Sequence, residues 1–320
     1  MRSTRDPVGI RGSGFGIRGL RPLVSAAAVA IGCLASIASA DHPSRGQAAD
    51  RTRIDAQSHH TKMLVPELSV QRLAFCPGGQ QLAVVTSEGT MFLVAWPGGS
   101  SRRYDPAPAK ARLPPCAATS AGFSPDGRWF AAPGNGDISI FDGDSGAVSR
   151  QLNGHLGTVN SVAFSPDGER LASVGADNDV RIWDMRTGQC VTTITTLTHG
   201  AFAVVWAPDG RRFYTGGASR TVTEWDAATG RRLRESSPGP YPIGELALSP
   251  DGQHLAVGSF NATGFNRAAR LAMLRTAGLD EERVIDSPGG GVVGLTFAPD
   301  GRSVLWAASN APGIAVWPID

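Results

Sequence analysis

The chain has 320 residues, with 30 lysines and arginines against 28 aspartates and glutamates, and 41% of its residues are apolar. This balance excludes a disordered acidic segment and a strongly basic nucleic-acid-binding protein, and it predicts an ordinary folded chain. Forty glycines, 22 prolines and only 7% aromatic residues indicate many turns between short strands, so we expect an all-β fold.

The first 40 residues have the pattern of a secretory signal peptide. Several arginines precede the uncharged apolar run Leu23–Ala40, which ends with small residues at Ala38 and Ala40. This order suits signal-peptidase cleavage, so we expect cleavage after Ala40 and an extracytoplasmic protein, periplasmic or secreted. Two alternatives stay open. The run is just long enough to remain as a membrane anchor, and Cys33 could carry a lipid.

One short phrase recurs six times in the rest of the chain: an apolar residue, a small residue, then Pro-Asp-Gly or a close variant. Its spacing of roughly 40 to 50 residues is that of a repeated supersecondary unit. Proline presets the backbone at the second position of a turn, aspartate suits the third, and glycine takes the left-handed angle that closes it. Each copy therefore predicts a strand, a turn and a second strand. The prolines are Pro77, Pro125, Pro166, Pro208, Pro250 and Pro299.

A third strand is predicted further along each unit. It is clearest in VRIWD, which ends at Asp184, and in TVTEWD, which ends at Asp226; a Thr-Gly turn follows each of them. A fourth strand then leads to the next unit. Four antiparallel strands with apolar residues on both faces are buried only if the sheets stack against one another around an axis.

These residues resemble the WD-repeat β-propeller family, most closely over residues 154–188. In that family a His, a Ser or Thr, an Asp and a Trp form a hydrogen-bonded set inside one blade. The resemblance implies a structural role for the matching residues here, which are His155, Ser173, Asp177 and Trp183.

The other units depart from the family pattern. The next unit keeps Thr215 and Trp225, but Ser219 replaces the aspartate, and the fifth unit has no tryptophan at this place. We expect each of these units to keep the four-stranded fold of the family although it lacks some of the motif residues.

The two ends of the chain predict how the ring closes. The sixth unit has no fourth strand of its own after Trp317, whereas Ser58–Val65 precedes the first unit at the offset of a fourth strand. We therefore predict an all-β, six-bladed β-propeller of four-stranded antiparallel blades over residues 58–320, closed by an N-terminal strand that completes the last blade. Residues 41–57 are polar and read as a linker.

No pattern for catalysis is found: the sequence lacks Gly-x-Ser-x-Gly, His-Glu-x-x-His and a phosphate loop. We predict no catalytic residue, no metal, no cofactor and no nucleic-acid partner, with membrane contact only through an uncleaved signal segment. The expected function is a non-catalytic protein-binding scaffold, because the fold presents loops on a rigid rim. The alternatives are a hydrolase or lactonase with a cation in the channel, and a sensor or binding subunit of an envelope complex.

Two insertions suggest a binding face. Ser100–Pro115 lies between the first two units and Asn261–Ala269 lies within the fifth, and connections of these two kinds project from the same end of a propeller. Their basic residues and one tyrosine predict binding of an acidic protein surface or an anionic envelope polymer. The alternative is a solvated loop without a partner. The predicted contact residues are Arg102, Arg103, Tyr104, Lys110, Arg112 and Arg267.

Overall fold

A computed structural model describes residues 62–64, 70–75, 79–86, 91–98, 100–103, 122–142, 147–195, 200–261, 269–287, 290–309 and 311–319. The predicted signal peptide and linker lie outside these residues, as do most of the two insertions. All the elements of the described residues are β-strands, which agrees with the all-β expectation. This part of the chain contains no helix long and apolar enough to cross a membrane.

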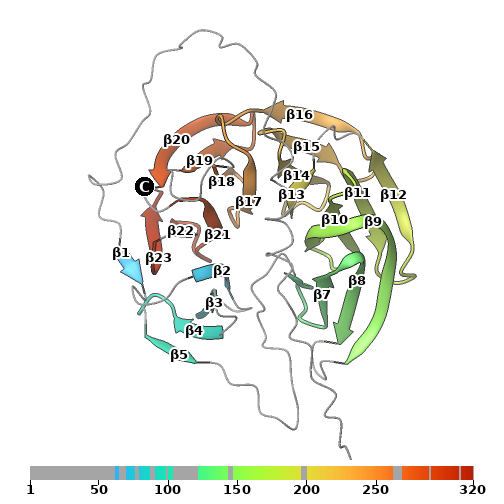
Figure 1. Cartoon of the computed structure of the whole chain (residues 1–320), viewed down its shortest axis with the longest axis horizontal. Helices are drawn as coiled ribbons and strands as arrows, with labels where there is room; N and C mark the ends of the chain where they lie inside the picture. Colours follow the sequence, from blue (N-terminus) through green and yellow to red (C-terminus); the bar gives the residue numbers. More distant parts are fainter. Residues whose placement is uncertain are drawn as a thin grey trace, which may run out of the picture.

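The strands form antiparallel sheets that are arranged around a common centre (Figure 1). One sheet has the order β2 (Val70–Phe75), β3 (Gln81–Thr86), β4 (Met91–Ala95), β5 (Ser101–Arg103). A second contains β13 (Ala201–Trp206), β14 (Arg212–Gly217), β15 (Val222–Asp226) and β16 (Arg232–Ser236). A third contains β17 (Ile243–Leu248), β18 (His254–Ser259), β19 (Ala269–Arg275) and β20 (Asp280–Ser287).

A fourth sheet joins the two ends of the described chain. It contains β21 (Val292–Phe297), β22 (Ser303–Ala308) and β23 (Ile314–Pro318), and its outer strand is β1 (Lys62–Leu64). In this pair Lys62 lies opposite Val316, and Leu64 lies opposite Ile314. The segment expected to supply a fourth strand to the last unit thus does so over its described residues.

The remaining sheet has seven strands because one strand serves two units. It contains β6 (Gly122–Phe123), β7 (Trp129–Pro133), β8 (Asn135–Asp142), β9 (Val148–Phe164), β10 (Arg170–Gly175), β11 (Asp179–Asp184) and β12 (Cys190–Thr195). The first part of β9 pairs with β8 and its last part pairs with β10. The sequence predicts two separate units here, and the structure joins them through one continuous strand.

Arg102 and Arg103 require a correction. They were expected in the exposed connection between the first two units, but they belong to β5 and pair with Leu93 and Phe92 of β4. The pairing satisfies backbone groups of β4 that would otherwise face solvent. The short Ser-Arg-Arg segment carries no apolar pattern that would have marked it as a strand.

The Pro-Asp-Gly turns have the predicted geometry. In the third unit the Gly168 N–H donates to the Ser165 carbonyl at 2.9 Å, and Gly168 has a φ of 71°. A Cβ atom at this glycine would lie 3.6 Å from the Pro125 ring of the preceding unit, and a Cβ at Gly79 of the first unit would lie 2.7 Å from Pro299 of the last. The turns of the second and third units therefore lie against each other, and so do those of the first and last units.

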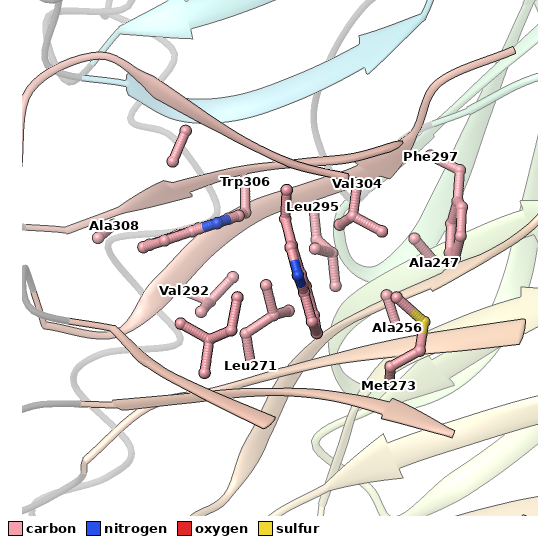
Figure 2. Close-up of a cluster of buried hydrophobic side chains, with 13 residues drawn as sticks. Ala247, Ala256, Leu271, Met273, Val292, Leu295, Phe297, Val304, Trp306 and Ala308 are labelled. Carbon is pink, nitrogen blue, oxygen red and sulfur yellow. The ribbon is translucent and has the colours of Figure 1, made fainter. Parts of the chain in front are cut away.

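The core lies between neighbouring sheets. Figure 2 shows one such layer, in which Leu271 and Met273 of β19 pack with Val292, Trp306 and other side chains of the next sheet. Burying an aliphatic side chain of this size contributes about 1.5–3 kcal/mol. Because each sheet buries both faces in this way, the stability of one unit depends on its neighbours.

Candidate functional site

Four side chains of the third unit form a continuous hydrogen-bond chain. The Trp183 indole N–H donates to Ser173 Oγ at 2.8 Å, and Ser173 Oγ lies 2.7 Å from His155 Nε2. His155 Nδ1 is 2.9 Å from the carboxylate of Asp177. An indole only donates, so we assign the serine hydrogen to His155 Nε2 and the imidazole hydrogen to Asp177. With a neutral histidine in this tautomer, every donor of the four side chains has an acceptor within the set.

The surrounding backbone is shaped to hold this set. His155 lies in the middle of β9, Ser173 lies on β10, and Asp177 lies in the turn that follows β10. A Cβ atom at Gly175 would come within 2.8 Å of both His155 Nδ1 and Asp177 Oδ1, so only glycine leaves room for them. Asp177 also accepts a hydrogen bond from the Leu156 N–H at 2.9 Å.

The protonation states follow from burial and hydrogen bonding. Burial lowers the pKa of His155 below its usual value, although the neighbouring Asp177 acts in the opposite direction. Burial acts to raise the pKa of Asp177, but hydrogen bonds from the Leu156 N–H and His155 outweigh it, and the pKa of Asp177 lies below its usual value. At neutral pH the pair is therefore a neutral imidazole beside a carboxylate.

The order Ser173, His155, Asp177 is also the order of a hydrolytic triad, but its surroundings do not suit catalysis. Ser173 is completely buried, and the side chain of His155 is only 1% exposed. The serine oxygen already accepts the hydrogen of Trp183, and no substrate carbonyl can approach it. The arrangement joins two strands and a turn, which is a structural role.

The stability of the protein should depend on pH through His155. The unfolded chain binds a proton on this residue at a pH near 6.5, and the folded chain binds it only at a lower pH. Between these values the unfolded state holds more protons, so the free energy of unfolding should fall as the pH drops below about 6.5. Urea unfolding of the wild type and of His155→Asn between about pH 7.5 and 5 measures this. The stability difference between them should shrink on acidification, and parallel curves would assign the pH dependence to another group.

The set is complete only in the third unit among the described residues. In the fourth unit the Trp225 indole donates to Thr215 Oγ1 at 2.9 Å, while Ser219 instead contacts the Thr221 hydroxyl at 2.7 Å. The strand register places Val257 of the fifth unit and Trp306 of the last unit where Ser173 lies in the third. Apolar packing replaces the polar set there.

The predicted contact residues are only partly placed by the structure. Tyr104, Lys110, Arg112 and Arg267 lie outside the described residues. Arg102 and Arg103 lie on β5, and the described residues do not bring them together with the polar set. No group of three or more potential metal-ligating side chains occurs in the described part of the chain.

Sequence reasoning missed an exposed leucine. Leu156 is 90% exposed, although its backbone N–H donates to the partly buried Asp177. The signal was available: a large apolar residue stands between His155 and Gly157, in a connection rather than inside a predicted strand.

A buried charged cluster was also missed. Glu224 is almost fully buried on β15, where Arg212 approaches it at 2.9 Å and the Tyr214 hydroxyl donates to it at 3.2 Å. Burial and the neighbouring Glu224 raise the pKa of Tyr214. Arg234, 3.6 Å from Glu224, also donates to the Ala277 carbonyl in the turn between β19 and β20 of the next sheet. The cluster therefore ties two sheets together.

Known proteins match the part of the chain that holds the polar set. The family model "WD domain, G-beta repeat" matches residues 146–184 and 188–226. A WD repeat-containing protein of Synechocystis, itself uncharacterised, is 29% identical over 126 residues, which are 39% of this chain and 34% of that protein. WD repeat-containing protein 1 of Bos taurus is 39% identical over 77 residues, or 23% of this chain and 13% of that protein.

Protein groucho of Drosophila melanogaster is 38% identical over 68 residues, which are 21% of this chain and 9% of that protein. The matched regions thus span about a third or less of these relatives. Both matched repeats coincide with units in which an indole donates to a serine or threonine hydroxyl. Residues 146–184 and 188–226 of the chain therefore match two tandem WD repeats.

Proposed function

We propose that this protein is a non-catalytic, extracytoplasmic scaffold that binds other proteins. The observation that carries the proposal is Leu156, an apolar side chain that is 90% exposed on a backbone fixed by Asp177. A backbone held in place before binding loses little entropy in a complex, which makes the side chain it presents an effective anchor for a partner. The neighbouring polar set provides that rigidity, and no catalytic role is needed for it.

A six-bladed closed ring would give this anchor a rigid platform. Two contacts support closure: β1 pairs with β23, and Gly79 of the first unit lies against Pro299 of the last. We propose that residues 58–320 form the complete propeller, with residues 41–57 as a linker behind a signal peptide of residues 1–40. The charge-free run Leu23–Ala40 and its small terminal residues support export.

The binding face would combine Leu156 with the two insertions. Leu156 lies in the middle of β9, where this strand passes from β8 of one unit to β10 of the next, and the insertion after Arg103 likewise follows the outer strand of one unit and precedes the inner strand of the next. Asp177, which contacts Leu156, lies in the same kind of connection as the second insertion. The basic residues of the insertions favour an acidic protein surface or an anionic envelope polymer, with binding weakened by salt because exposed charges are screened. The proposed contacts beyond Leu156 are Arg102, Arg103, Tyr104, Lys110, Arg112 and Arg267.

Capture of partners from an envelope extract tests this proposal. Leu156→Ser should weaken capture by about tenfold or more without changing the melting temperature, because the side chain is 90% exposed in the free protein. Replacing Arg102, Arg103, Lys110 and Arg112 together with serine should remove the salt-sensitive part of binding. Leu233→Ser is the control, because Leu233 is an exposed leucine on β16, outside the proposed face. Unchanged capture by both test variants would exclude this face.

A further inference from the structure

The strand β12 lies at the outer end of its sheet. It pairs with β11 on one side, and no other described strand pairs with it. Figure 1 shows β12 on the outside of the ring, away from the centre. Among the described residues, the outward backbone edge of β12 has no strand partner and can pair with another strand, as at any sheet edge; one carbonyl of β12, that of Thr192, accepts from the Cys190 thiol at 3.4 Å.

The composition of β12 sets it apart from the other outer strands. Its sequence CVTTIT contains no charged residue, no glycine and no proline. The other outer strands, β1, β5, β16, β20 and the first half of β9, each contain at least one lysine, arginine, aspartate or glutamate. Charged side chains on an edge oppose unwanted strand pairing, and β12 lacks this protection.

The two faces of β12 differ in burial. Ile194 is buried, and a Cβ added to Gly230 of the next sheet would lie 3.1 Å from it. Val191, Thr193 and Thr195 lie on the other face and are exposed. The strand is thus anchored by one face, while the other face presents three β-branched side chains, the type that pairs best across strands.

We propose that β12 is a dimer edge, which pairs antiparallel with β12 of a second copy of this chain. The best partner for an uncharged edge rich in β-branched residues is a strand of the same composition whose own edge is also unpaired. Among the described strands, β12 itself has both properties, so a second copy of β12 is the best partner. A twofold axis at Thr193 places Thr193 opposite its own copy and Val191 opposite Thr195. In this register every facing pair from 191 to 195 is β-branched. A symmetric contact of this kind closes at two subunits.

Sedimentation equilibrium of the full chain tests the proposal. The wild type should dimerise, whereas Thr193→Lys and Thr193→Glu should each be monomeric, with a Kd weakened by about tenfold or more, because like charges face one another at the axis. An equal mixture of the two variants should recover the dimer, since opposite charges then meet. Recovery also shows that each variant is folded.

Leu233→Lys is the matched control, because it adds a lysine at an exposed apolar position of the already charged outer strand β16. It should dimerise like the wild type. A wild type that stays monomeric to about 100 µM overturns the proposal. A dimer that survives in Thr193→Lys, a mixture that stays monomeric, or a Leu233→Lys variant that dissociates equally would also overturn it. The test needs no other partner, so it is independent of the proposed scaffold function.

Discussion

Replacing His155 with alanine should lower the free energy of unfolding by about 1–3 kcal/mol, because the change leaves buried groups without partners. Ser173 Oγ loses the acceptor 2.7 Å away, and the carboxylate of Asp177 loses the imidazole N–H. Both partners stay enclosed, so water cannot easily replace the lost hydrogen bonds. Urea denaturation at pH 7.5, above the range in which His155 titrates, measures the difference.

His254→Ala is the control for this experiment. His254 is partly exposed and lies 3.4 Å from Glu282, so its removal should change the free energy of unfolding by less than about 0.5 kcal/mol. Equal effects of the two alanine substitutions, or a loss below about 0.5 kcal/mol for His155→Ala, would show that the polar set does not hold its unit together.

Deleting residues 58–65 should lower the melting temperature by about 5 °C or more and cause self-association. The deletion removes β1, and β23 then loses the partner that pairs with Ile314, Ala315 and Val316. The exposed edge of β23 carries the apolar sequence IAVW, which favours pairing between chains. Differential scanning calorimetry and light scattering measure the two effects.

A deletion of equal length within the predicted linker, residues 43–50, is the control and should change neither property. If both deletions leave the melting temperature and the degree of self-association equal to those of the wild type, β1 does not complete the last sheet in solution. The six-bladed closure would then be wrong. If the linker deletion alone destabilises the protein, the boundary proposed at residue 57 is misplaced.

The sequence alone was sufficient for features that depend on local chemistry. The Pro-Asp-Gly turns could be predicted because proline and glycine restrict their own backbone angles, and Gly168 has the left-handed φ that this chemistry requires. The recurrence of these turns implied repeated antiparallel sheets. The four members of the polar set were named from a family resemblance, and the structure places them within hydrogen-bonding distance of one another.

Only the tertiary structure decided the features that depend on neighbouring units. Arg102 and Arg103 lie in a strand because β4 offers them a free edge, and Glu224 is buried because Arg212 and Tyr214 approach it. Likewise, Leu156 is exposed, and the outer edge of β12 is unpaired, because no other described element packs over them. Backbone pairing and burial join residues far apart in the chain, so local sequence patterns carry little information about them.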